Sequence, residues 1–300
     1  MATGEIAEPT FHWLLKSGYE MVGLVTQPDR PVGRHQELHP PGVKVIAVEA
    51  GIPVFQPESL RGEGDLDAIR EWNPELIVVM AYGQILPQKL IDLPKMIINL
   101  HASLLPRHRG ASCLQAAIRE GDLDSGWTIM HVIKKLDAGD IIVQDTTPLS
   151  TVETGGSLHD RMALSGPGSL EKALGKIERG KADGVPQDDS AVTYAPKLLR
   201  ADGELNFSLS ALELERFIRA YDPWPGTFTV VKAEGKKPRR LRVFPAVKIG
   251  NSSGHPGTLQ KTDEGELEVL TGEGSLILGE VQLEGGKRIS SEDFLRGWRL

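Results

Sequence analysis

The sequence has little cysteine and no long apolar run. Cys113 is the only cysteine in 300 residues, which excludes an internal disulfide and a thiolate-rich zinc site. No segment reaches the roughly 18 apolar residues that a membrane-spanning helix needs. The first residues, MATGE, lack the basic and apolar regions of a secretory signal peptide. We therefore expect a cytoplasmic protein with no membrane partner.

Two nucleotide-binding motifs are also missing. The chain has no G-x-x-x-x-G-K-[ST] segment, and no G-x-G-x-x-G follows a predicted strand. Nothing in the sequence therefore favours a nucleoside triphosphate or a dinucleotide as ligand, and we expect no metal site. The net charge of −7 argues against a protein that coats nucleic acid.

Basic residues are nevertheless concentrated in one C-terminal stretch, where Glu234 is the only acid. Such a stretch either attracts phosphate groups or protects a strand edge from pairing, and charge alone leaves both interpretations open. Its members are Lys232, Lys236, Lys237, Arg239, Arg240, Arg242 and Lys248.

The first part of the chain alternates apolar runs with helical patterns, which predicts a doubly wound, Rossmann-like α/β domain with a parallel sheet. Strands are predicted at 21–25, 54–55, 76–80 and 97–100. The pattern opens with a helix at 10–16, although such a sheet usually opens with a strand. We therefore expect the first strand of the sheet to be missing.

The C-terminal part has the pattern of a small β-barrel, of the kind found in oligonucleotide-binding folds. A helix is predicted at 157–180, and another after the capping-box spacing at Ser210. Short strands separated by glycine-rich turns follow from 227, the last of them at 276–283. We predict a catalytic domain at 1–182, a linker at 183–205 and an OB-like domain at 206–300.

Three polar residues are candidates for catalysis. Asn99 and His101 are two residues apart in a predicted strand, so their side chains share one face. An amide donor beside an imidazole suits a developing oxyanion, and the imidazole can also move a proton near neutral pH. Asp137 lies in a predicted loop, where its carboxylate could orient the histidine or simply form a turn. We expect His108 on the surface and Cys113 in the core.

The segments NLHASLLPRHRGA at 99–111 and LDAGD at 136–140 together resemble the folate-dependent formyltransferases. Further segments resemble the members that act on methionyl-tRNA, namely TQPDRP at 26–31, AYG at 81–83, TYAPK at 193–197 and IRA at 218–220. The resemblance implies transfer of a formyl group from 10-formyltetrahydrofolate to the amino group of initiator methionyl-tRNA. It assigns the oxyanion to Asn99 and His101, and the tuning of His101 and assistance with proton transfer to Asp137.

The resemblance also implies binding residues. We expect the chain to act as a monomer without metal. The folate site would comprise Ile85, Leu86, Ser103, Leu104, Leu105, Pro106, Leu136 and Gly139. The tRNA would contact Arg34, Lys232, Lys236, Lys237, Arg239 and Arg240.

The sequence departs from this family in three places. After Arg34 it continues HQE, where the family is usually basic, so the attraction for phosphate should be weaker. Cys113 replaces a usual proline, for which we expect a packing change only. The missing first strand should leave backbone groups unpaired and lower the stability. Two alternatives remain: a formyltransferase for a small amine, such as glycinamide ribonucleotide or an amino sugar nucleotide, and a non-catalytic truncated relative.

Overall fold

The computed structural model describes residues 1–33, 36–62, 64–232 and 237–298. The chain divides into two compact units. The N-terminal unit comprises Met1–Cys113, Asp124–Pro148 and His159–Pro196, and the C-terminal unit comprises Leu114–Leu123, Leu149–Leu158 and Lys197–Leu300. None of the described helices is long and apolar enough to cross a membrane.

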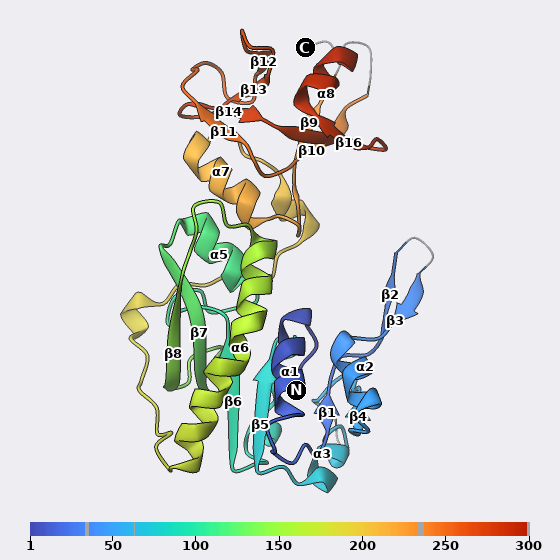
Figure 1. Cartoon of the computed structure of the whole chain (residues 1–300), viewed down its shortest axis with the longest axis vertical. Coiled ribbons are helices and arrows are strands. Elements are labelled where there is room, and N and C mark those ends of the chain that lie inside the picture. The colour runs from blue at the N-terminus through green and yellow to red at the C-terminus, as the bar shows by residue number, and fades with distance from the viewer. Residues whose placement is uncertain (34–35, 63, 233–236, 299–300) are drawn as a thin grey trace. The chain divides into compact units, whose positions relative to one another are not determined.

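The N-terminal unit is built on a four-stranded sheet in the order β5-β6-β7-β8 (Figure 1). Its strands are β5 (Leu76–Met80), β6 (Met96–His101), β7 (Asp124–His131) and β8 (Ile141–Pro148). The predicted parallel pairing is confirmed for β5 and β6, whereas β7 runs antiparallel to both β6 and β8. The sheet is therefore mixed, with a short loop joining the antiparallel strands β7 and β8, as only antiparallel neighbours allow.

Helix α6 (Gly155–Glu178) packs along this sheet (Figure 1). The indole N–H of Trp127, in β7, donates to the Met162 carbonyl at 3.0 Å. Near the other end of α6, Lys176 Nζ donates to the Ile142 carbonyl at 2.6 Å. These contacts hold the helix against the strands that carry the candidate site.

The N-terminal unit has a gap where the sequence predicts a missing strand. Strand β1 (Leu24–Val25) pairs in parallel with β4 (Val54–Phe55), and in the described chain this pair forms a sheet of its own. Met1 and Ala2 bridge it to β5: the Ala2 N–H donates to the Val25 carbonyl, and the Met80 N–H donates to the Met1 carbonyl, both at 3.0 Å.

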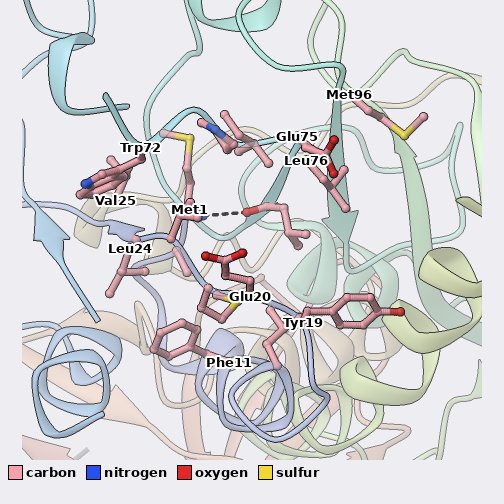
Figure 2. A pocket seen from close by; sticks show the side chains of 18 of the residues that line it. Met1, Phe11, Tyr19, Glu20, Leu24, Val25, Trp72, Glu75, Leu76 and Met96 are labelled. Atoms are coloured by element: carbon pink, nitrogen blue, oxygen red, sulfur yellow. Dashed lines mark hydrogen bonds between the residues drawn. The ribbon is translucent and has the colours of Figure 1, made fainter. Parts of the chain in front are cut away.

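A cavity of about 680 Å³ lies behind this two-residue link (Figure 2). Apolar side chains such as Phe11, Trp72 and Leu76 line it. The α-amino group of Met1 donates to the Val78 carbonyl at 2.7 Å. Burial lowers the pKa of this amine to about 5, because the charged form loses its hydration.

Short elements complete the N-terminal unit. The β2–β3 hairpin is antiparallel, and α3 ends at Asn73 in the left-handed conformation, a common way for a helix to stop. These elements are η1 (Glu5–Ala7), α1 (Glu8–Leu14), β2 (Arg30–Val32), β3 (Glu37–His39), α2 (Gly42–Glu49), α3 (Asp67–Trp72), α4 (Gln88–Ile91) and η2 (Asp189–Ala191).

The C-terminal unit holds two four-stranded antiparallel sheets, in the orders β16-β15-β10-β9 and β11-β14-β13-β12. A single core, which includes Leu241, Leu267 and Val281, joins them. This confirms the predicted β-rich second domain. The strands are β9 (Thr227–Val231), β10 (Arg239–Val243), β11 (Lys248–Gly250), β12 (Leu259–Lys261), β13 (Leu267–Leu270), β14 (Ser275–Leu278), β15 (Glu280–Leu283) and β16 (Arg288–Ser290).

Helices pack against this core as well. Helix α7 begins at Ser210 with the predicted capping box: Ser210 accepts from the Glu213 N–H, and Glu213 accepts from the Ser210 N–H. Helix α7 supplies the buried Leu214 and Ile218, and α8 supplies Phe294. The remaining elements are α5 (Cys113–Glu120), η3 (Arg200–Gly203), α7 (Ala211–Ala220) and α8 (Ser291–Gly297).

Candidate active site

Strand β6 delivers two of the three candidate residues to the end of the sheet. Asn99 lies opposite Met130 and His101 opposite Thr128 in the pairing with β7. Since alternate residues of a strand point the same way, the two side chains share a face. His101 is buried, with 6% of its surface exposed, while Asn99 is half-buried. The Asn99 carboxamide makes no hydrogen bond to any described residue, so its donors are available to a ligand.

The imidazole of His101 is held at both nitrogens. Nε2 lies 2.9 Å from the backbone carbonyl of His108. A carbonyl only accepts, so Nε2 carries a proton and donates. Nδ1 lies 3.8 Å from Oδ2 of Asp137. The structure therefore brings His101 and Asp137 together from segments 36 positions apart (137 − 101).

Several groups act in opposite directions on the pKa of His101. Burial lowers its pKa, but a hydrogen bond with Cys113, the negative charges that Cys113 and Asp137 can carry, and the His108 carbonyl all raise it. The net effect raises the pKa of His101 to about 9. The imidazole is then a cation at neutral pH and a strong hydrogen-bond donor.

Asp137 occupies a strained and tightly held loop between β7 and β8. Its φ is +47°, which is uncommon for a residue other than glycine. Its Oδ2 accepts from the Gly110 N–H at 2.8 Å, which fixes the carboxylate. Two residues on, a Cβ at Gly139 would lie 1.8 Å from the His131 carbonyl oxygen, so this position must be glycine.

The predicted folate residues at 103–106 follow directly on β6. Ser103 and Leu105 are buried, and Leu104 and Pro106 are half-buried. The Leu105 N–H donates to Thr128 Oγ1 at 3.1 Å, and Gln144 donates to the Leu105 carbonyl at 2.9 Å. The backbone of this segment is therefore fixed by side chains of β7 and β8.

The other predicted folate residues differ in exposure. Ile85 and Leu136 are 70% and 54% exposed, unusually open for large apolar side chains. Leu86 packs against the core that contains Tyr82, and Gly139 is buried. A pterin ring has apolar faces and a polar edge, so exposed aliphatic side chains beside held backbone suit its chemistry.

The predicted tRNA residues are described only in part. Arg34 and Lys236 lie outside the described residues. Lys232 and Lys237 are exposed, and the β10 residues Arg239 and Arg240 are half-buried and exposed, respectively. The guanidinium of Arg240 lies 4.3 Å from the centre of the Phe228 ring, which keeps its charge at the surface of the sheet.

Three features of the site were mispredicted or missed. His108 is 4% exposed, so the prediction of a surface position is wrong: its amide donates to Thr193 Oγ1 at 2.8 Å, and its carbonyl accepts from His101. Cys113 is buried as predicted, but it contacts His101, so its effect extends beyond packing. Gln187, in the predicted linker, was missed: its Nε2 donates to the Asp137 and Gly139 carbonyls, each at 2.9 Å. A glutamine in a segment without apolar periodicity carries no sequence pattern that would assign it to a catalytic site.

The fold and the site together define a class of protein. It is an α/β group-transfer domain, with an imidazole–carboxylate pair at the end of a strand, joined to a β-rich second unit. The chain belongs to the formyl transferase family: the formyl transferase domain matches residues 2–174, and the formyl transferase C-terminal domain matches residues 197–299.

Named relatives are similar over nearly the whole chain. A methionyl-tRNA formyltransferase of Akkermansia muciniphila is 52% identical over 299 residues, covering 99% of this chain and 95% of that protein. One from Ectopseudomonas mendocina is 45% identical, covering 99% and 93%.

Solved structures share the fold at low identity. The N-formyltransferase of Helicobacter canadensis in complex with folinic acid and dTDP-3-aminofucose has a TM-score of 0.65 at 16% identity, covering 96% of this chain and 97% of that one. Methionyl-tRNA formyltransferase from Clostridium thermocellum has a TM-score of 0.53 at 15% identity, covering 80% and 91%.

No group of three or more histidine, cysteine, aspartate or glutamate side chains gathers within the described ranges in a way that could hold a metal ion.

Proposed function

We propose that the chain transfers a formyl group from 10-formyltetrahydrofolate to the amino group of methionine on initiator tRNA, in the cytoplasm, for translation initiation. The chemistry rests on the His101–Asp137 pair, in which Nδ1 and Oδ2 lie 3.8 Å apart. Asn99 shares a face of β6 with His101, and its amide makes no hydrogen bond to the described residues. The acceptor rests on the 52% and 45% identity to methionyl-tRNA formyltransferases.

The chain's residues would act on a carbonyl under attack by an amine. As the nitrogen–carbon bond forms, the electron pair of the formyl C=O moves to oxygen. The Asn99 N–H donors and the His101 cation stabilise this oxyanion, because both donors are fixed before charge develops. The tetrahedral centre then collapses, the carbon–N10 bond to the folate breaks, and the proton lost by the amine is delivered to N10.

Asp137 has two functions in this scheme. Its charge stabilises the protonated form of His101, and the bond from the Gly110 N–H keeps the carboxylate aimed at the ring. The carboxylate also provides an acceptor for the amine's proton, directly or through water. The folate would lie against Ile85, Leu86, Leu136 and Gly139 and the segment from Ser103 to Pro106.

The C-terminal unit would hold the tRNA by its phosphates. Lys232, Lys237 and Arg240 are exposed cations on one short stretch, and Arg239 is partly exposed beside them. Exposed lysine and arginine bind a phosphate backbone mainly by releasing its counterions. Arg34 and Lys236 complete the predicted set.

A direct test measures formyl transfer from 10-formyltetrahydrofolate to charged initiator and elongator tRNA. We expect formylation of the initiator only, and a loss of activity in His101→Ala. His12→Ala removes an exposed histidine from α1 and is the matched control. Equal background rates in the wild type and in His101→Ala would favour a non-catalytic relative. Transfer to a free small amine, with none to tRNA, would favour the small-amine enzyme.

A further inference from the structure

The loop that carries Asp137 is partly exposed to solvent. It comprises residues 132–140 between β7 and β8, and Leu136 and its neighbours at 133–135 are exposed. The left-handed φ of +47° at Asp137 costs free energy, so this conformation persists only where the surroundings enforce it. Some group outside the loop must therefore fix the backbone on which the carboxylate stands.

The Gln187 side chain is that group. Its Nε2 donates to the Asp137 carbonyl and to the Gly139 carbonyl, each at 2.9 Å. One amide thus bridges the backbone on both sides of Ala138. The Asp137 carboxylate is held separately, by the Gly110 N–H at 2.8 Å.

The other end of the same carboxamide is fixed by Arg109. Gln187 Oε1 accepts from Arg109 Nε at 3.1 Å and from Nη2 at 2.7 Å. Arg109 is 1% exposed, so it needs this acceptor, since an unpaired buried cation is strongly destabilising. At its outer end Arg109 meets Asp189 at 3.5 Å, and Lys135 also contacts Asp189, at 3.1 Å.

Only an amide satisfies both sets of partners. A guanidinium donates and cannot accept, while backbone carbonyls accept and cannot donate. The orientation of the carboxamide is therefore dictated by its neighbours, with oxygen toward Arg109 and nitrogen toward the loop. Glutamate would keep the first contact and lose the second, and methionine would lose both.

We propose that Gln187 is a positioning residue, whose bridge to the 137–139 backbone aims the Asp137 carboxylate at His101. It touches neither the reacting atoms nor His101. Its effect on the rate rests on the proposed function, whereas its effect on His101 does not. The groups that face His101 are Cys113 from α5, Asp137 from the loop and the His108 carbonyl.

The test compares Gln187→Glu and Gln187→Met in the full chain. For each variant, kcat and KM are measured for formyl transfer, and the His101 ring is titrated by NMR without substrate. We expect both variants to lower kcat about tenfold, as loss of an orienting partner commonly does, with KM changed less. In Gln187→Met, which adds no charge, the His101 titration should move to lower pH.

A purely structural role predicts a different pattern. If Gln187 serves only to satisfy Arg109, then Gln187→Glu keeps wild-type kcat and only Gln187→Met is impaired. That result, or an unchanged His101 titration in a folded Gln187→Met, would overturn the proposal. If Gln187→Met does not fold, kcat of Gln187→Glu decides alone.

The matched control is Gln282→Met, in which a half-buried glutamine of β15 loses a 2.9 Å bond to the Gly286 carbonyl. It should change neither kcat nor the His101 titration. The two proposals also fail differently. A wild type without formyl transfer, together with a shifted His101 titration in Gln187→Met, would reject the proposed function and retain the positioning function.

Discussion

At the scale of single residues, the site depends on donors that are in place before a substrate binds. The Asn99 carboxamide makes no hydrogen bond to the described residues, and the His101 ring is fixed by the His108 carbonyl at 2.9 Å. Asn99 can therefore donate to an oxyanion without breaking such a bond, while the charge of the His101 ring acts on the oxyanion with Nε2 still bonded to His108. Preorganised donors of this kind are often the largest single contribution to catalysis.

We predict large losses of rate from removing either donor. His101→Ala should lower kcat by about 10²- to 10⁴-fold, and Asn99→Ala by about 10²- to 10³-fold. The measurement is single-turnover formyl transfer with saturating tRNA. A loss confined to KM would contradict assignment of these residues to the chemical step.

The pH dependence of the reaction should report His101. The folded-state pKa is raised from 6.5 to about 9, so the ring is charged at neutral pH and becomes neutral as the pH rises through about 9. We expect kcat/KM to fall on that alkaline side. The stability contributed by the charged ring is complete below the unfolded pKa and is lost over the same rise. A rate that keeps rising past pH 10 would contradict a cationic His101.

Cys113 gives a second way to test the charge on His101. Cys113→Ala removes a group that raises the pKa of His101, so the alkaline limb of the rate profile should move to lower pH. Ser112→Ala is the control, since it removes a neighbouring buried hydroxyl that bonds to Pro196. Identical profiles in the two variants would mean that the thiol does not act on the ring.

At the scale of secondary-structure elements, we expect the gap between β1 and β5 to lower the stability of the N-terminal unit. Met1 and Ala2 already form a parallel bridge to Met80 at one end of it. Behind them the cavity of about 680 Å³ extends along residues 21–24 and 74–78. A strand joined upstream of Met1 would run into this space in the same direction as its two neighbours.

We predict that extending the chain upstream of Met1 with five β-branched residues raises the melting temperature by about 5–10 °C. Each new backbone hydrogen bond contributes about 1 kcal/mol, which corresponds to roughly 2–4 °C in a domain of this size. The control extension replaces the second and fourth of these residues with proline, which cannot donate to a sheet. Equal melting temperatures for the two extended chains would contradict strand insertion.

Element positions were predicted well where apolar periodicity is strong. The strands expected at 54–55 and 76–80 are β4 and β5 as observed, and the helix expected at 157–180 is α6 at Gly155–Glu178. The single strand expected at 276–283 is two, β14 and β15, separated by Gly279. The sequence pattern does not place this break, because a single glycine inside a strand-like run also occurs within an unbroken strand.

At the scale of the whole molecule, the proposed function requires an acidic chain to bind a polyanion. The net charge is −7, so we propose that the attraction comes from the local cluster of basic residues on the C-terminal unit. Arg240 and Lys237 are exposed there, and β10 holds Arg240 by its backbone pairing with Val230. Binding through a few exposed cations should depend strongly on salt.

We predict that the KM for charged tRNA rises steeply with salt, and that Arg240→Ala and Lys237→Ala each lower the slope of log KM against log salt by about 1. Lys95→Ala, which removes an exposed lysine paired with Glu75 in the N-terminal unit, is the control. Unchanged slopes in both test variants would place the tRNA elsewhere.

The sequence by itself determined the α/β and β-rich parts, the spacing of Asn99, His101 and Asp137, and the family they resemble, because these follow from local periodicity and short motifs. Only the tertiary structure decided that the sheet is mixed, that His108 is buried, that Cys113 meets His101, and that Gln187 bridges the Asp137 loop. Those contacts join residues far apart in the sequence: Gln187 and Asp137 are 50 positions apart, and His108 and Thr193 are 85 positions apart. Their formation depends on how the chain packs, which no local pattern encodes.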